Sequence, residues 1–177
     1  MINTFKVLVI STVISFGMIG CSATQETTSP QQTESQDIAY PSWYEQVMFQ
    51  TDSTSFIGYG EAVALDSVTA IKNAELQARV NLEAGVSEII EETRESISDK
   101  GNETVNTPEF LIMLRNASQA IQKEGTIANK TSLNKDSYFR GYATVRISRS
   151  EALTTLRTGF EANQGYWRIL NDSSLFQ

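Results

Sequence analysis

The chain has 177 residues, of which 14 are basic and 21 acidic, giving a net charge of −7, and it contains no histidine and one cysteine. Nucleic acid is excluded as a partner because polyanions are bound by clustered lysine and arginine, and the sequence has no such cluster. The missing histidines remove the commonest general base and a common zinc ligand, and one cysteine cannot form a disulfide within the chain. We therefore expect no catalytic site, no metal site and no cofactor.

The N-terminal residues have the pattern of a bacterial lipoprotein signal peptide. Lys6 precedes an apolar run over residues 7–19, and this run is too short to span a bilayer, which needs about 20 apolar residues. Residues 18–21 resemble the lipobox, in which a small residue precedes the cysteine that is diacylated and becomes the mature N-terminus. We expect residues 1–20 to be removed by cleavage between Gly20 and Cys21, and Cys21 to be lipidated. An ordinary secretory signal or uncleaved anchor, and a buried structural helix, are the alternatives.

Residues 21–40 are expected to form a disordered tether. Apart from Ala23, residues 22–37 are all Ser, Thr, Gln, Glu, Asp or Pro, which offer no apolar surface whose burial could offset the entropy of ordering. A flexible segment of this length lets a domain lie roughly 20 Å from its anchor. By resemblance to lipoproteins of enteric bacteria, Ser22 after the cysteine favours the outer membrane. We expect the lipid on Cys21 to hold the chain there, with the domain facing the periplasm.

A single globular domain is expected over residues 41–165, because this segment is long enough for one hydrophobic core and too short for two. The first strand is predicted over residues 56–63, where aromatic and β-branched residues alternate with Gly58, Gly60 and Ala62. The two glycines do not form a phosphate-binding loop, since the third glycine and the Lys-Ser/Thr pair of such loops are missing.

A long helix should follow, capped by Asp66 or Ser67 and running to about Ser98. Small residues recur along it at four-residue steps. They are Ala70, Ala74 and Ala78. Because small side chains let a helix backbone approach its neighbour closely, we expect this alanine stripe to pack on the glycine face of the first strand.

The second half of the domain carries local start and stop signals. Thr107-Pro108 provides an N-cap and a first-turn proline, and Ser148 with Glu151 forms a capping box. The predicted elements are a helix over 107–123, strands over 126–133 and 138–147 joined by a turn at 134–137, and a last helix to about Phe160. The sequence therefore predicts an α+β domain, with a small antiparallel three-stranded sheet backed by a long helix in the order β-α-α-β-β-α.

Several of these features together resemble a known family. They are Pro41-x-Trp43, Gly58-x-Gly60-Glu61-Ala62, a long helix with Ala70, Ala74, Ala78, Arg79 and Leu82, and a closing hairpin with Gly141. The chain resembles the Lpp-twenty family of small outer-membrane lipoproteins, which includes flagellar basal-disk lipoproteins. The resemblance covers residues 41–160 and the lipidated N-terminus, and it implies a non-enzymatic envelope component, often self-assembling.

Two sets of residues are candidates for an interaction surface. Tyr138, Arg140, Tyr142 and Arg146 share one face of the last predicted strand, where they either pack across strands at a wet surface or contact a partner. The C-terminal tail, residues 166–177, is too apolar to remain in solvent without contacts. It either folds back on the domain or docks on a neighbouring subunit or envelope partner. The tail residues singled out are Tyr166 and Trp167.

Three functions remain open. The first is a structural or assembly lipoprotein of the outer membrane, which forms homo-oligomers or binds another envelope protein. The second is a flagellar basal-disk or motility-associated lipoprotein. The third is a periplasmic module that binds a small ligand or peptide, for which an apolar pocket with converging polar groups would be needed.

Overall fold

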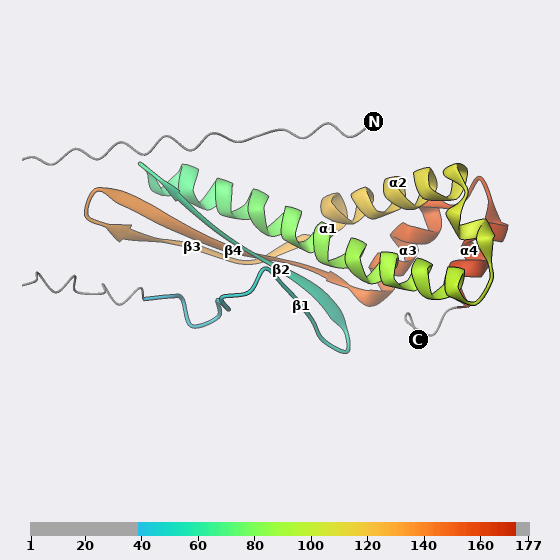
Figure 1. The fold of residues 1–177 in the computed structure, drawn as a ribbon. Coiled ribbons are helices and arrows are strands. Elements are labelled where there is room, and N and C mark those ends of the chain that lie inside the picture. Colours follow the sequence, from blue (N-terminus) through green and yellow to red (C-terminus); the bar gives the residue numbers. More distant parts are fainter. Residues whose placement is uncertain (1–38, 173–177) are drawn as a thin grey trace, which may run out of the picture. The chain divides into compact units, whose positions relative to one another are not determined.

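The computed structural model describes residues 39–172, which belong to one compact unit (Figure 1). The predictions for the signal peptide, Gly20, Cys21 and the tether up to residue 38 lie outside the described residues, as does the end of the tail. The elements are β1 Phe49–Thr51, β2 Ser55–Ala64, α1 Ser67–Asp99, the 3-10 helix η1 Glu103–Asn106, α2 Pro108–Glu124, β3 Thr126–Lys135, β4 Tyr138–Ser148, α3 Arg149–Gly159 and α4 Gln164–Asn171.

The predicted fold class is confirmed, because the described domain is α+β with an antiparallel sheet and helices. The sheet has four strands in the order β1-β2-β4-β3, so the expectation of three strands is wrong. The additional strand, β1, spans three residues and pairs Phe49 with Gly58 and Thr51 with Phe56. So short a strand carries no alternating pattern. It is held instead by this pairing and by Phe49, whose ring fills the space beside Gly85 of α1.

The predicted contact between the alanine stripe and the glycine face forms the centre of the domain. α1 lies along one face of the sheet (Figure 1), and the alanines of the stripe are completely buried. A Cβ atom added to Gly60 would lie 2.1 Å from the carbonyl oxygen of Ala74, and one added to Gly141 would lie 2.2 Å from that of Ala70. Helix and sheet therefore meet backbone to backbone, and this interface has no room for a ligand.

The capping signals operate as predicted. The side chain of Asp66 accepts a hydrogen bond from the backbone N–H of Thr69, so α1 begins at Ser67. Thr107 caps α2, and Ser148 and Glu151 form the capping box of α3. Each cap supplies a partner for a backbone N–H group that the first turn of a helix leaves without one.

The helices after the sheet build the other end of the domain. α2 packs on α3, and the ring of Phe110 on α2 lies 5.5 Å from that of Phe160. α4 was not predicted as a helix, because its apolar residues belong to the expected tail. Asn163 caps it by accepting hydrogen bonds from the backbone N–H groups of Gly165 and Tyr166, and Leu170 is completely buried.

Candidate interaction surfaces

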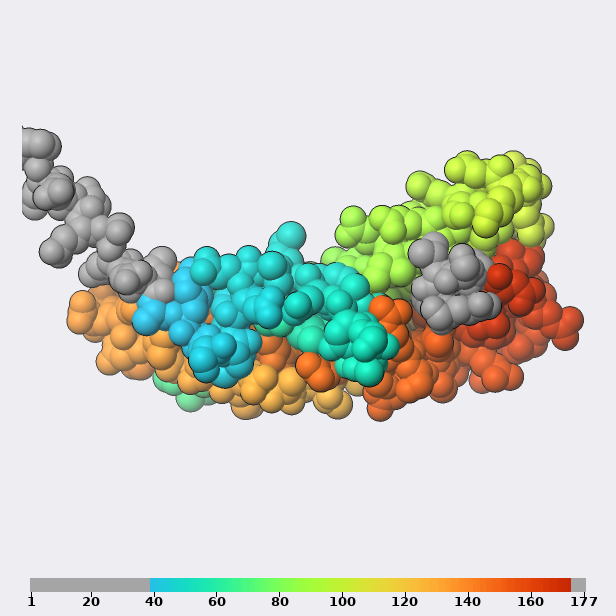
Figure 2. Space-filling model, turned by 90° about the horizontal axis from the view of Figure 1, so that it is seen from below, coloured from blue at the N-terminus to red at the C-terminus, as the bar shows by residue number. Residues whose placement is uncertain are grey.

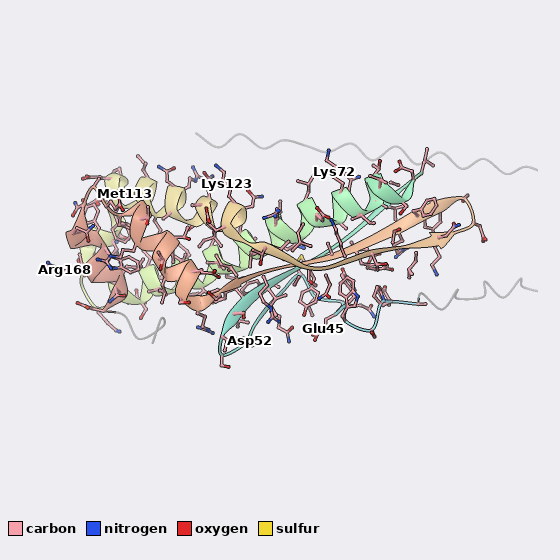
Figure 3. The ribbon with its side chains drawn as sticks, turned by 180° about the vertical axis from the view of Figure 1, so that it is seen from behind. Glu45, Asp52, Lys72, Met113, Lys123 and Arg168 are labelled. Atoms are coloured by element: carbon pink, nitrogen blue, oxygen red, sulfur yellow. The ribbon has the colours of Figure 1, made fainter. Side chains whose placement is uncertain are left out.

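The face of the sheet opposite α1 is covered by the chain that enters the domain. We call residues 40–48 the strap. The ring of Tyr44 lies 4.8 Å from that of Tyr142 on β4 and 5.8 Å from that of Tyr59 on β2. Tyr40 stacks on Tyr44 at 5.9 Å. Figure 2 looks onto this face, where the blue and cyan residues of the strap lie over the strands, and Figure 3 shows Glu45 of the strap on the side of the sheet away from Lys72 of α1.

The strap corrects the expectation that Tyr142 lies on an open surface. Its side chain is completely buried beneath the two strap tyrosines. Alternation along a strand shows which residues share a face, and Tyr138, Arg140, Tyr142 and Arg146 do share one. It does not show whether a distant segment covers that face. The relevant signal was the aromatic segment that opens the domain, with Tyr40, Trp43 and Tyr44.

The other three residues of this face lie on either side of Tyr142, the position that the strap covers. Arg140 forms an ion pair with Glu61 of β2, and both side chains are mostly shielded from water. Arg146 is exposed at the far end of the strand, whereas Tyr138 is half-buried beside the β3–β4 turn. The predicted set therefore forms no continuous exposed surface, because its central member is buried and Arg140 is engaged within the domain.

The buried environment keeps these tyrosines neutral. Burial, and next the negative charge of Glu61, raise the pKa of Tyr44 to about 12 from the 10.0 of an exposed tyrosine. Burial also raises the pKa values of Tyr59 and Tyr142. A tyrosinate beneath the strap would lose its hydration, so the contact favours the protonated phenol. The strap is thus held by packing of neutral rings across a wide pH range.

The beginning of the expected tail folds back on the domain. The ring of Tyr166 lies 5.3 Å from that of Phe110, and its hydroxyl donates a hydrogen bond to Glu109 at 3.1 Å. Trp167 packs against Phe160 with ring centroids 6.4 Å apart. Both predicted residues are therefore engaged within their own domain, and each retains a partly exposed side chain. Residues 173–177 lie outside the described residues.

A groove that sequence reasoning missed lies between α1 and α2. Its volume is about 700 Å³, and it contains the exposed apolar side chains Leu111 and Ile112 of α2. Charged groups also line it, with Glu83 and Glu91 from α1 and Arg115 from α2. Leu111 is 40% exposed, because α2 packs its buried side on α3.

A second surface that was missed is the edge of the sheet formed by β3. This strand is the last in the order, its first five residues are exposed, and its pairing with β4 is interrupted by a bulge between Ile127 and Asn129. Lys130 bonds to Glu75 of α1 at 2.8 Å. Edge strands present backbone N–H and C=O groups that can pair with another chain. Sequence alone did not show which of the predicted strands would be outermost.

The described residues were compared with the requirements of a metal site and of a membrane span. Between residues 39 and 172, no three His, Cys, Asp or Glu side chains are placed to hold a metal ion. No helix in this part of the chain combines the length and apolar character needed to cross a membrane. Comparisons with protein families, with curated proteins and with solved structures find no match. The resemblance to the Lpp-twenty family therefore stays a prediction.

Proposed function

We propose that this protein is a lipid-anchored lipoprotein of the outer membrane with a non-enzymatic structural or assembly role. The observation that carries the proposal is Gly20-Cys21, which directly follows a short apolar run and directly precedes a polar segment. Signal sequence, acylated cysteine and tether account for these three features together, whereas a buried helix would account only for the first.

The described domain supports a role in which its surface contacts other proteins. Its helix and sheet meet through Gly60 and Gly141 at backbone contact, which gives a rigid scaffold. The carboxylate of Glu61 is bound to Arg140 on the covered face. Among the side chains that are left open are the apolar ones of the α1–α2 groove and those of the β3 edge. We propose that the β3 edge mediates self-association, by pairing with a strand of a second copy.

The anchor is tested by a Cys21→Ser variant expressed in a bacterium with a lipoprotein pathway. Wild-type protein should fractionate with the outer membrane, and its N-terminal peptide should carry acyl chains by mass spectrometry. The variant should lose both properties and enter the soluble periplasmic fraction. A variant that stays in the membrane without acyl chains would contradict the proposal, since the anchor would then be a different segment.

Self-association is tested by light scattering on protein that begins at Ser22, over a range of protein concentrations. Ile127→Lys places a charge on the β3 edge and should shift oligomers toward monomer, whereas Leu111→Lys in the α1–α2 groove is the matched control. A monomer at every concentration would contradict self-association. Oligomers that Leu111→Lys dissociates and Ile127→Lys does not would show that the groove is the interface instead of the edge.

A further inference from the structure

One end of the domain exposes apolar side chains that have no role in the fold. Leu65 is 86% exposed, Val68 76% and Val63 53%. They lie where β2 passes into α1, and the neighbouring strand β3 is tied to this region by the hydrogen bond between the hydroxyls of Ser67 and Ser132, at 2.7 Å. We call this region the hairpin end.

The position of Leu65 makes its exposure notable. It directly precedes the helix cap Asp66, and an apolar residue at this position commonly packs against the fourth residue of the helix. Here that residue is Ala70, which is completely buried under the sheet and out of reach of so exposed a side chain. Val68, in the first turn of α1, also points to solvent. Neither residue stabilises the helix start, so their apolar character needs another explanation.

The chain that leads to Cys21 leaves the domain at this same end. Going backward from Phe49, which pairs with Gly58, the strap runs toward the end of β2, and Tyr40 lies beside Tyr142. Figures 1 and 3 show the first described residues and the β3–β4 turn at one end of the domain, with α3 and α4 at the other. Only residues 22–38 of the predicted tether separate this exit from Cys21, and a flexible tether of that length would span roughly 20–25 Å.

We propose that the hairpin end is a lipid-contact surface, which inserts Leu65, Val68 and Val63 into the interface of the bilayer. This inference rests on the lipid anchor of the proposed function. A short tether keeps the end of the domain at a high effective concentration near the membrane, so weak apolar contacts suffice. A bilayer accepts apolar side chains without a shaped pocket. The partner is therefore the membrane that holds Cys21.

The charges around the hairpin end are balanced. Asp66 and Asp136 are acidic, and Lys72 and Lys135 are basic. An electrostatic surface would attract anionic lipid through an excess of lysine and arginine. No such excess exists here, so we expect contact through apolar side chains, with little dependence on the charge of the lipid.

The test uses the full lipidated protein in vesicles. Acylation occupies Cys21, so Leu65→Cys introduces the one free thiol, which is labelled with an environment-sensitive fluorophore. The vesicles contain phosphatidylethanolamine and phosphatidylglycerol, with nitroxide on the upper acyl chain of a fraction of the lipid. The label at position 65 should be quenched by the nitroxide and show blue-shifted emission. The matched control is Ile112→Cys, an exposed apolar position on α2, whose label should be quenched much less.

The possible failures are distinguishable. Protein that floats with the vesicles while the label at position 65 is no more quenched than that at position 112 overturns the lipid contact and leaves the anchor intact. A blue shift without nitroxide quenching also overturns it, because the side chain would then be buried in protein. Quenching only on anionic vesicles overturns insertion through apolar groups. Protein without acyl chains that does not float removes the proposed function itself.

Discussion

Replacing Gly60 by alanine is the sharpest test of the backbone contact between α1 and the sheet. The added Cβ would lie 2.1 Å from the oxygen of Ala74 and 2.4 Å from the nitrogen of Ala78. Ordinary contact begins at 3.4 Å, so the helix would have to move outward by about 1.3 Å. Both neighbours are backbone atoms of a continuous helix, so no side chain can rotate away to make room.

The expected cost is about 3 kcal/mol, at the upper end of the range for overpacking, because moving α1 loosens its contact with β2 and β4 as well. Elsewhere in a strand the same substitution would stabilise the protein by roughly 0.5 kcal/mol, through the lower entropy of the unfolded chain. Contact with α1 therefore decides that Gly60→Ala lowers the free energy of unfolding instead of raising it. The free energy of unfolding, from urea denaturation followed by circular dichroism, measures it, and the melting temperature should fall by roughly 10 °C.

Gly165→Ala is the matched control, since its nearest neighbour is the side-chain oxygen of Asn163 at 3.2 Å and α4 favours alanine. It should leave stability unchanged or slightly raised. The double variant Gly60→Ala/Gly141→Ala should cost less than the sum of its parts, because one displacement of α1 relieves both clashes. Gly60→Ala within about 0.5 kcal/mol of wild type would refute the backbone contact.

Three other predictions concern the strap, a helix cap and pH. Tyr44→Ala should lower the free energy of unfolding by about 2 kcal/mol, because it removes the ring that packs on Tyr59 and Tyr142. Tyr44→Phe keeps this packing and should cost less than about 0.5 kcal/mol. Equal losses for the two variants in urea denaturation would contradict this expectation. Ser148→Ala should cost about 1 kcal/mol by removing the capping box of α3, and a neutral result would show that α3 is held by packing alone. Since the pKa of Tyr44 is about 12 when folded and 10.0 when exposed, the folded state holds this proton more tightly, and stability should fall as pH rises between these values. Urea titrations at alkaline pH measure the fall, which Tyr44→Phe should reduce; an unchanged pH dependence in that variant would contradict the assignment.

The parts of the fold that the sequence predicted correctly depend on local chemistry or on size complementarity. Capping side chains act within one helical turn, so Thr107 and Ser148 located the starts of their helices. The match between the alanine stripe and the glycine face is a long-range contact, yet it was predictable. Small residues on two elements leave space that only close approach can fill, and the strand carrying Gly60 had a single long helix beside it.

The parts that were missed depend on which segment covers a face or an edge. β1 is too short to show a period, and α4 lies in a segment whose apolar residues allow either a tail or a helix. The strap is the most consequential omission, because it buries Tyr142, which seemed exposed from alternation alone. The covering residues, Tyr40 and Tyr44, are separated from Tyr142 by about 100 residues of chain, and no local rule connects them.

The strap also connects the proposed lipid anchor with the proposed lipid contact of the hairpin end. If Cys21 is anchored as proposed, a pull on the chain before the strap would act first on Tyr40 and Tyr44, since these residues precede β1 along the chain. Their rings pack on β2 and β4, the two central strands of the sheet, rather than on an edge strand. The pull would therefore act on the two central strands, of which β2 also packs against the backbone of α1 at Gly60. Since the strap begins at the hairpin end, the two proposals together would bring that end to the membrane and would leave the β3 edge and the α1–α2 groove to protein partners.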